Sequence, residues 1–465
     1  MPLGENKRTI YRLMITLMIA FFGSVLVMSV IDIFTENKTD GLVAFALFYI
    51  SLAFLLVSYL VLKIKSEKMF LIILIAVAFS VRLIWILTVN TVLDSDYVLM
   101  YNAALKGANG DFSFSTSSYY SQWAYQMGFT LYQSLIISVF GKDPFILKLI
   151  NCIISTGTTV LVYKIAGAVF NEKAGRTASI LYALYLPTVI VNSVLTNQIL
   201  AAFLFYLAFY LFLTNRRGKI YIYIIVAALI ALGQFIRPLA MFVLPCFVIY
   251  ELIEFVITKE KKLIIGTCLT LAVYFVLMAL AGNIIVSDKI SSYGLENREP
   301  YWKFVIGLNT ETTGQYSDDD AAYVEKFSLG EERNKAELEL IKERTQDKHQ
   351  LLVLMLNKYS AMWGTRDSTV YWSANVDVPN LMKNVGMYEQ EMYIIAVLLA
   401  FIASFALFRK RNNKLYFLMI LILLYMAAHL FIEIQTRYRD FALPAIFIFT
   451  GYGMYLLIGQ KQKER

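Results

Sequence analysis

The chain has 465 residues, of which 58% are hydrophobic and only 16% are charged, and its mean hydropathy is +0.61. A soluble protein of this composition would lack the polar residues needed to cover its surface. The net charge of +8 does not indicate nucleic-acid binding, because the Lys and Arg residues stand in short clusters between apolar blocks. The three cysteines fall inside apolar stretches and indicate no disulfide framework.

The apolar blocks predict an all-α polytopic membrane protein with about 12 transmembrane helices, because each block can cross or nearly cross a hydrocarbon core about 30 Å thick. The expected spans are residues 13–31, 42–62, 69–89, 145–169, 178–195, 198–213, 220–236, 238–257, 263–286, 392–408, 415–434 and 441–458. Basic clusters fall in alternate connections, which places both termini in the cytoplasm of a plasma membrane. Residues 123–140 are also apolar, but a crossing there would move every later basic cluster outside. We expect this aromatic-rich stretch to lie along the outer surface as a juxtamembrane helix.

These elements divide the chain into four parts. Residues 1–65 form two extra N-terminal spans, and residues 66–286 form a transmembrane catalytic core with a first outer loop at 90–144. Residues 287–391 form an extracytoplasmic segment, in which the charged run 331–348 predicts a small helical subdomain. Residues 392–465 supply the C-terminal transmembrane helices.

An acid pair, Asp94 and Asp96, stands where the span 69–89 leaves the membrane on the outer side. These residues could simply cap or solubilise the loop. An Asp-x-Asp metal site for a nucleotide-sugar is disfavoured, because nucleotide-sugars are cytoplasmic. A carboxylate beside the bilayer can instead act as a general base that takes the proton from an acceptor hydroxyl, with its pKa tuned by the membrane and protein around it.

Three arginines, Arg237, Arg437 and Arg439, are exceptions to the charge rule on the outer side. Each stands near a helix end, so snorkelling to lipid headgroups is one interpretation. The other is a clamp on a lipid phosphate, because guanidinium groups bind phosphate oxygens bidentately. Arg82, inside a span near its outer end, either joins this clamp or pairs with Glu433.

Several short motifs now define a family resemblance. Ser95-Asp96-Tyr97, Tyr101-Asn102-Ala103-Ala104 with Gly107, and the aromatic stretch ending at Phe140-Gly141 resemble the first outer loop of GT-C glycosyltransferases. The closest likeness is to the family that includes protein O-mannosyltransferases and the aminoarabinose transferase of lipid A. The matching segments further on are Leu186-Pro187, residues 192–198, residues 233–238, and residues 433–439 with Pro444.

The resemblance implies a polyprenyl-phosphate sugar donor, inversion at the sugar, and a catalytic Asp in the first outer loop. We assign that role to Asp96, with Asp94 as the second choice. Family members often carry an acidic residue near positions 196–198, where this chain has amides. The candidates for contacts with the sugar or the acceptor are Tyr97, Tyr101, Trp123, Asn197 and Gln198.

The sequence thus predicts an enzyme that transfers a sugar from a polyprenyl-phosphate donor to an extracytoplasmic acceptor such as a cell-wall glycopolymer, without metal or cofactor. Two alternatives stay open. A lipid-linked polysaccharide polymerase or ligase would rely on Arg and His in a large outer loop. A non-enzymatic lipid or solute transporter would show polar residues at mid-membrane and often inverted repeats.

Overall fold

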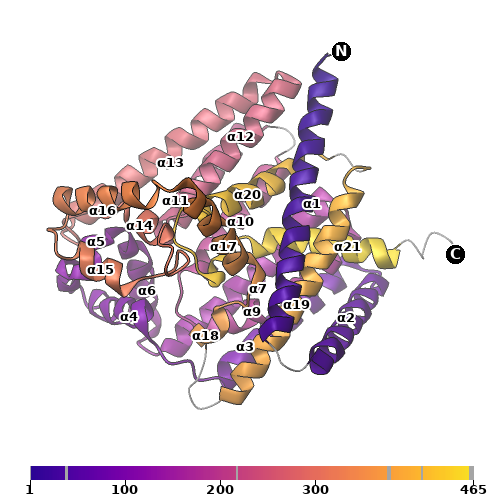
Figure 1. Ribbon diagram of the computed structural model, residues 1–465, viewed down its shortest axis with the longest axis horizontal. Coiled ribbons are helices and arrows are strands. Elements are labelled where there is room, and N and C mark those ends of the chain that lie inside the picture. Colours follow the sequence, from indigo (N-terminus) through magenta and orange to yellow (C-terminus); the bar gives the residue numbers. More distant parts are fainter. Residues whose placement is uncertain (1, 37–39, 216–217, 374–378, 410–411, 460–465) are drawn as a thin grey trace.

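The computed structural model describes residues 2–36, 40–215, 218–373, 379–409 and 412–459, and every regular element in these ranges is a helix (Figure 1). The predicted all-α fold class is therefore confirmed. The long helices that build the bundle are α1 (Pro2–Glu36), α2 (Asp40–Lys63), α3 (Glu67–Thr88), α7 (Pro144–Val169), α8 (Glu172–Leu184), α10 (Gln198–Thr214), α11 (Ile220–Ile236), α12 (Ala240–Thr258), α13 (Lys261–Ser287), α19 (Pro379–Ala406), α20 (Lys414–His429) and α21 (Leu443–Gly459).

Shorter helices fill the connections. Between α3 and α7 lie α4 (Ser95–Gly107), η1 (Ser113–Thr116), α5 (Ser118–Gln122), η2 (Ala124–Gln126) and α6 (Met127–Phe140). Between α13 and α19 lie α14 (Trp302–Gly307), α15 (Asp318–Val324), α16 (Glu331–Arg344), α17 (Lys348–Gly364) and α18 (Thr369–Ser373). The remaining pieces are α9 (Leu186–Ile190), η3 (Val191–Ser193) and η4 (Thr436–Phe441). In Figure 1, α4–α6 and α14–α16 gather on one side of the bundle, opposite the C-terminus.

Within the described residues, seven helices are long and apolar enough to cross a membrane: α1, α2, α3, α7, α12, α13 and α19. The pair formed by α8 and the segment Leu186–Ser193, bent by 64°, adds an eighth candidate if it is one span. Four shorter apolar helices are α10, α11, α20 and α21. Every expected span falls on one of these helices or on the bent pair, which makes this a multi-pass membrane protein. The count of twelve crossings stays a prediction.

The bend between α8 and α9 follows from Pro187. A proline has no N–H, so the carbonyl of Ala183 loses the partner that a continuous helix would give it. Arg82 on α3 supplies the missing donor, because its Nη1 lies 3.2 Å from the Ala183 oxygen. The same guanidinium donates to Ser155 Oγ at 2.8 Å and to Thr188 Oγ1 at 3.3 Å. A buried Arg therefore joins α3, α7 and the broken span at one point.

Helix α6, within the stretch expected to lie along the outer surface, packs against α4 and α11. The contact with α11 is close because Gly128 has no side chain. A Cβ added at this position would lie 1.8 Å from the backbone oxygen of Phe235. Leu135, Val139 and Phe140 on α6 remain exposed. Gly128 thus fixes the position of α6 beside the C-terminal end of α11, where Arg237 follows.

We expect Gly128→Ala to push α6 away from α11, since the Phe235 carbonyl belongs to the backbone and cannot rotate aside. Overpacking of this kind costs about 1–3 kcal/mol, so the midpoint of thermal unfolding in detergent should fall. Gly167→Ala on α7 is the matched control, because a Cβ there meets nothing within 4 Å. Equal unfolding midpoints for the two variants would contradict the close contact.

Candidate active site

The connection between α20 and α21 forms the centre of a polar cluster on the side of the bundle where α4–α6 and α14 lie. Its backbone is fixed to the segment 287–391: Glu433 N–H donates to Lys303 O at 2.8 Å, and Ile434 N–H donates to Gly314 O at 2.9 Å. Gly307 allows this approach, because a Cβ there would lie 2.3 Å from the Ile432 carbonyl carbon. The C-terminal connection is thus held firmly beside α14.

Asp96 reaches this cluster from the first turn of α4. Asp94 is the N-cap of that helix, and its Oδ1 accepts a hydrogen bond from Ser95 N–H at 2.7 Å. Asp94 therefore has a local structural partner, whereas Asp96 projects from the helix start toward the groups of the C-terminal connection. The two acids of the pair thus have different surroundings.

The electrostatic neighbours of Asp96 come from three separate segments. Its side chain reaches solvent, yet protein surrounds it on several sides, and this desolvation raises the pKa of Asp96 above its usual value. The positive charges of Arg437 and Lys303 act in the opposite direction, and the negative charge of Glu433 adds to the rise. Asp96 and Arg437 therefore share one cluster, although 340 residues separate them in the sequence.

Arg437 lies in an aromatic setting. Its guanidinium carbon is 4.5 Å from the ring centre of Trp372 and 5.6 Å from that of Tyr97. Its Nε donates to Gln435 Oε1 at 2.6 Å. Burial lowers the pKa of Arg437, with Tyr438 and Asp96 opposing, but a guanidinium stays charged in proteins. The arrangement leaves a cation between aromatic rings, near a carboxylate.

Glu433 and Lys303 form an ion pair at the edge of the cluster, with Glu433 buried and Lys303 partly exposed. Tyr438 Oη also donates to Glu433 Oε2 at 3.1 Å. Burial acts to raise the pKa of Glu433, but Lys303 and these hydrogen bonds hold it below its usual value. Glu433 is therefore the partner of Lys303 and not of Arg82, the alternative that the sequence left open.

Arg237 enters the cluster from the end of α11. Its Nη1 donates to Asn197 Oδ1 at 2.6 Å, and its guanidinium carbon lies 5.5 Å from the Tyr438 ring centre. Gln198, the next residue, donates from Nε2 to the Arg437 carbonyl at 2.9 Å and to Asp440 Oδ2 at 3.4 Å. The two predicted amides thus connect α10 with both arginines.

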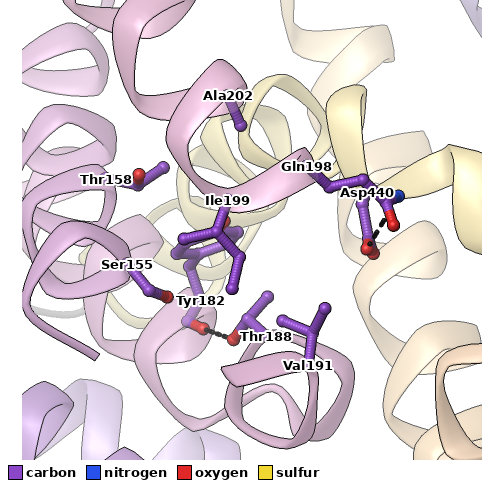
Figure 2. Close-up of a pocket in the computed structure, with 9 residues that line it drawn as sticks. All are labelled: Ser155, Thr158, Tyr182, Thr188, Val191, Gln198, Ile199, Ala202 and Asp440. Atoms are coloured by element: carbon purple, nitrogen blue, oxygen red, sulfur yellow. Dashed lines mark hydrogen bonds between the residues drawn. The ribbon is translucent and has the colours of Figure 1, made fainter. Parts of the chain in front are cut away.

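A small pocket lies beside Gln198, between α7, the broken span and α10 (Figure 2). Gln198 and Asp440 form one side of it, and the other polar lining groups are hydroxyls. The residues that line it are Ser155, Thr158, Tyr182, Thr188, Val191, Gln198, Ile199, Ala202 and Asp440. The polar character of the cluster therefore continues into the bundle.

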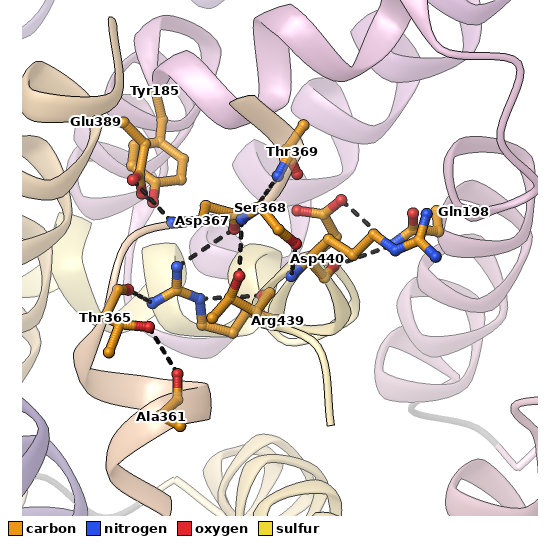
Figure 3. A network of polar contacts seen from close by, with 12 residues as sticks. Tyr185, Gln198, Ala361, Thr365, Asp367, Ser368, Thr369, Glu389, Arg439 and Asp440 are labelled. Carbon is orange, nitrogen blue, oxygen red and sulfur yellow. Dashed lines mark hydrogen bonds and ion pairs between the residues drawn. The ribbon is translucent and has the colours of Figure 1, made fainter. Parts of the chain in front are cut away.

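Two of the predicted arginines do not join the cluster. Arg82 is fully buried in the hydrogen-bond network at the α8–α9 break. Arg439 is also fully buried and faces Asp367, whose Oδ2 lies 3.5 Å from its Nη2 (Figure 3). Its Nη1 donates to the Thr365 carbonyl at 2.8 Å. Burial opposes its charge, but Asp367 holds the pKa of Arg439 above its usual value.

The predicted aromatic residues also separate. Tyr97 lies against Arg437 and packs edge-on against Trp372, with ring centres 5.6 Å apart. Tyr101 is buried in a different apolar group and donates its hydroxyl to the Lys142 carbonyl. Trp123 packs against Tyr119 at a ring distance of 5.2 Å and pairs its backbone with Asn297. Only Tyr97 has a direct contact with a charged group of the cluster.

Sequence reasoning missed Asp440 and Trp372, and gave no role to Lys303 in this site. Asp440 is a second carboxyl group beside the amides at positions 197–198. Burial raises the pKa of Asp440 well above its usual value, and Asp367 acts in the same direction against the nearby arginines. Its position directly after Arg439 was the available signal. No group of three or more His, Cys, Asp or Glu side chains suited to a metal ion occurs in the described part of the chain.

Part of the chain is similar to a known protein family. A profile of the family described as dolichyl-phosphate-mannose-protein mannosyltransferase matches residues 127–281, about one third of the chain. None of the curated proteins compared with the chain matches it.

Solved structures extend the likeness over most of the chain. The oligosaccharyltransferase of Archaeoglobus fulgidus, tethered with an acceptor peptide containing the NVT sequon, matches with a TM-score of 0.54 and 14% identity over 87% of this chain. A structure of the same organism's oligosaccharyltransferase AglB with an inhibitory peptide and a dolichol-phosphate matches with a TM-score of 0.51 and 12% identity over 85%. ArnT from Cupriavidus metallidurans bound to undecaprenyl phosphate matches over 84% of this chain and 78% of its own at 11% identity, with a TM-score of 0.38 that is too low to support a comparison of folds.

The chain spans about half the length of the oligosaccharyltransferase, 51% and 50% in the two structures. At these identities the likeness establishes the fold alone, which is the GT-C fold that the motifs predicted. The glycosyltransferase activity that the motifs predict remains a proposal for this chain, since the family profile covers only one third of it.

Arg439 should be needed for folding and not for binding. Arg439→Leu leaves the Asp367 carboxylate buried without its cation, which costs about 3–5 kcal/mol, so the thermal unfolding midpoint should fall sharply. The double variant Arg439→Leu/Asp367→Leu should recover much of that loss, since no buried charge remains unpaired. Arg437→Leu is the comparison and should change the midpoint little. If Arg437→Leu destabilised as much as Arg439→Leu, this separation of roles would be wrong.

Proposed function

We propose that the protein transfers a sugar from a polyprenyl-phosphate donor, of the undecaprenyl type, to a hydroxyl group of an extracytoplasmic acceptor such as a cell-wall glycopolymer. The observation that carries the proposal is the shared cluster of Asp96, Arg437 and Lys303, in which a carboxylate and cations from distant segments meet. The dolichol-phosphate in the matching archaeal oligosaccharyltransferase supports a lipid-phosphate carrier. The plasma membrane, an outward-facing site and cytoplasmic termini remain part of the proposal.

In the proposed reaction, Asp96 accepts the proton of the acceptor hydroxyl while the hydroxyl oxygen attacks the anomeric carbon of the sugar. A new carbon–oxygen bond forms as the bond from the anomeric carbon to the phosphate oxygen breaks, and the electron pair leaves with the lipid phosphate. This single displacement inverts the anomeric carbon. Ionised Asp96 is the required form, and its position between solvent and protein keeps it accessible to the acceptor.

The positive groups of the cluster stabilise the departing phosphate. Arg437 is the first candidate, because Trp372 and Tyr97 orient its guanidinium and it lies near Asp96. Arg237 is the second, held by Asn197 and Tyr438. Preorganised cations at the site of developing charge are an effective means of lowering a barrier. We leave Arg82 and Arg439 out of this role, since both are buried and bonded to protein.

The remaining polar groups are proposed to bind sugar or acceptor. Asn197 and Gln198 line the inner side of the cluster. Asp440 beside Gln198 supplies a carboxyl group near the positions where family members often carry an acidic residue. Tyr97 and Trp372 offer aromatic faces for a sugar ring. Tyr101 and Trp123 pack within the protein, so we give them no part in binding.

Replacement of the base tests the proposal. Asp96→Asn should fold normally and bind the donor lipid, but transfer sugar from a synthetic polyprenyl-phosphate donor at least about 100-fold more slowly, the range expected for loss of a general base. Asp94→Asn is the matched control and should retain most activity, because Asp94 caps α4. Reversal of the two results would exchange their roles, and near-full activity of both variants would refute the mechanism.

The pH dependence should report the same carboxylate. Because desolvation raises the pKa of Asp96, the active ionised form should be lost already at a pH above the usual aspartate value of about 3.9. Below that midpoint kcat/KM should fall about tenfold per pH unit, and the residual activity of Asp96→Asn should lack this acid limb. Measurement of kcat/KM across the acid and neutral range checks this, and an identical limb in Asp96→Asn would exclude Asp96 as its source.

A further inference from the structure

One buried hydroxyl beside Asp96 has no partner. Tyr119, on α5, is 8% exposed, and its Oη makes no hydrogen bond of standard geometry with any described residue. Its ring is held edge-on between Tyr120 and Trp123, with centres 5.2 Å away in both cases. Burial of a hydroxyl without a hydrogen-bond partner costs folding free energy. Its retention in a rigidly packed side chain therefore suggests that the hydroxyl has a role in the site.

Tyr119 can act only as a donor toward Asp96. Burial, and next the Asp96 carboxylate, raise the pKa of Tyr119 well above its usual value, so the phenol keeps its proton. In turn, Tyr119 is among the groups that lower the pKa of Asp96 against desolvation, although no hydrogen bond of standard geometry joins the two side chains in this structure. The phenol and the carboxylate are thus a matched donor and acceptor. Catalytic hydrogen bonds are often poorly aligned without substrate and tighten when it binds.

The other neighbour of Tyr119 leads to Arg237. Gln126 interacts with the Tyr119 hydroxyl through its side chain, and its Oε1 accepts a hydrogen bond from Asn197 Nδ2 at 3.3 Å. Asn197 Oδ1 accepts from Arg237 Nη1 at 2.6 Å. With Gln126 Oε1 occupied by Asn197, its Nε2 is the group left to donate to Tyr119. If Tyr119 bonded both Gln126 and Asp96, each side chain between Arg237 and Asp96 would accept one hydrogen bond and donate one.

We propose that Tyr119 is a positioning residue for Asp96, and that it completes a one-way chain of donors from Arg237 through Asn197, Gln126 and Tyr119 to the Asp96 carboxylate. The proposal rests on the proposed function, in which Asp96 is the base and Arg237 faces the lipid phosphate. Hydrogen bonds that point in one direction polarise one another. The chain occupies one carboxylate oxygen, so the other oxygen is aimed at the acceptor hydroxyl, and it connects the base with the phosphate-binding end of the site.

The first test is the pH profile of Tyr119→Phe. Loss of a hydrogen bond to a charged group should move the acid limb of kcat/KM to higher pH by about one unit, because ionised Asp96 loses a stabilising donor. At the plateau kcat should fall about 3- to 30-fold with little change in KM, since the carboxylate is less well oriented. Tyr120→Phe is the matched control: its hydroxyl bonds Thr130 Oγ1 at 2.6 Å, and its limb should stay in place.

A second variant tests whether the effect of Tyr119→Phe comes from the lost hydrogen bond or from altered packing. Gln126→Leu interrupts the chain one step earlier without touching the aromatic contacts of Tyr119, and should move the limb in the same direction by a smaller amount. An unmoved limb in both Tyr119→Phe and Gln126→Leu would overturn the proposal. Equal shifts in Tyr119→Phe and Tyr120→Phe would do so as well, because the effect would then come from packing.

A measurement without turnover separates this proposal from the proposed function. Infrared titration of the purified protein can follow the carboxyl band of Asp96, assigned by its loss in Asp96→Asn. Its midpoint should be higher in Tyr119→Phe than in the wild-type protein and unchanged in Tyr120→Phe. This shift together with no transfer from any lipid-phosphate sugar would refute the function while the contact stood. Transfer with identical midpoints in the wild-type protein and Tyr119→Phe would refute the contact alone.

Discussion

The ion pair between Arg439 and Asp367 fixes the segment on which the candidate site is built. Both side chains are fully buried, and Asp367 Oδ1 also accepts the Thr369 N–H at 2.8 Å. Glu389 on α19 accepts the Asp367 N–H at 3.0 Å and the Tyr185 hydroxyl at 2.8 Å, so the broken span, α18, α19 and η4 meet at this point (Figure 3). A buried ion pair adds little stability over apolar packing, but the loss of one partner is severe. The pair therefore acts as a constraint on where η4 can lie.

This constraint explains why two arginines in one short motif have different surroundings. Arg437 and Arg439 are separated by one residue in η4, a 3₁₀ helix with about three residues per turn. When Arg439 points into the protein toward Asp367, Arg437 is turned to another side, toward Trp372 and Tyr97. The structural arginine thereby orients the proposed functional one, and Tyr438 between them contacts Glu433 and Arg237.

Arg82, inside the bundle, also has a structural role. An arginine in an apolar span is usually interpreted as a functional residue, because placing a charge in the membrane costs free energy. Here Pro187 removes one backbone donor from the broken span, and the Arg82 guanidinium replaces it at the Ala183 carbonyl. The resulting bend directs the chain into the segment 194–198 that carries Asn197 and Gln198. Arg82 therefore stabilises the bend in the fold and, through that bend, helps to place two residues of the candidate site. The sequence alone cannot distinguish this structural role from direct binding of a ligand.

The sequence by itself determined the helical class and the place of each apolar helix, because these depend on local hydrophobic length. It placed Asp96 in the connection that follows the span 69–89, but it did not predict the helix that begins there. It also indicated Asn197, Arg237 and Arg437 through short motifs. Only the tertiary structure decided that Arg439 faces inward, that Asp440 lies beside Gln198, and that the Tyr119 hydroxyl is buried without a bonded partner. These facts depend on side-chain directions and on contacts between separate segments of the chain, which no local pattern encodes.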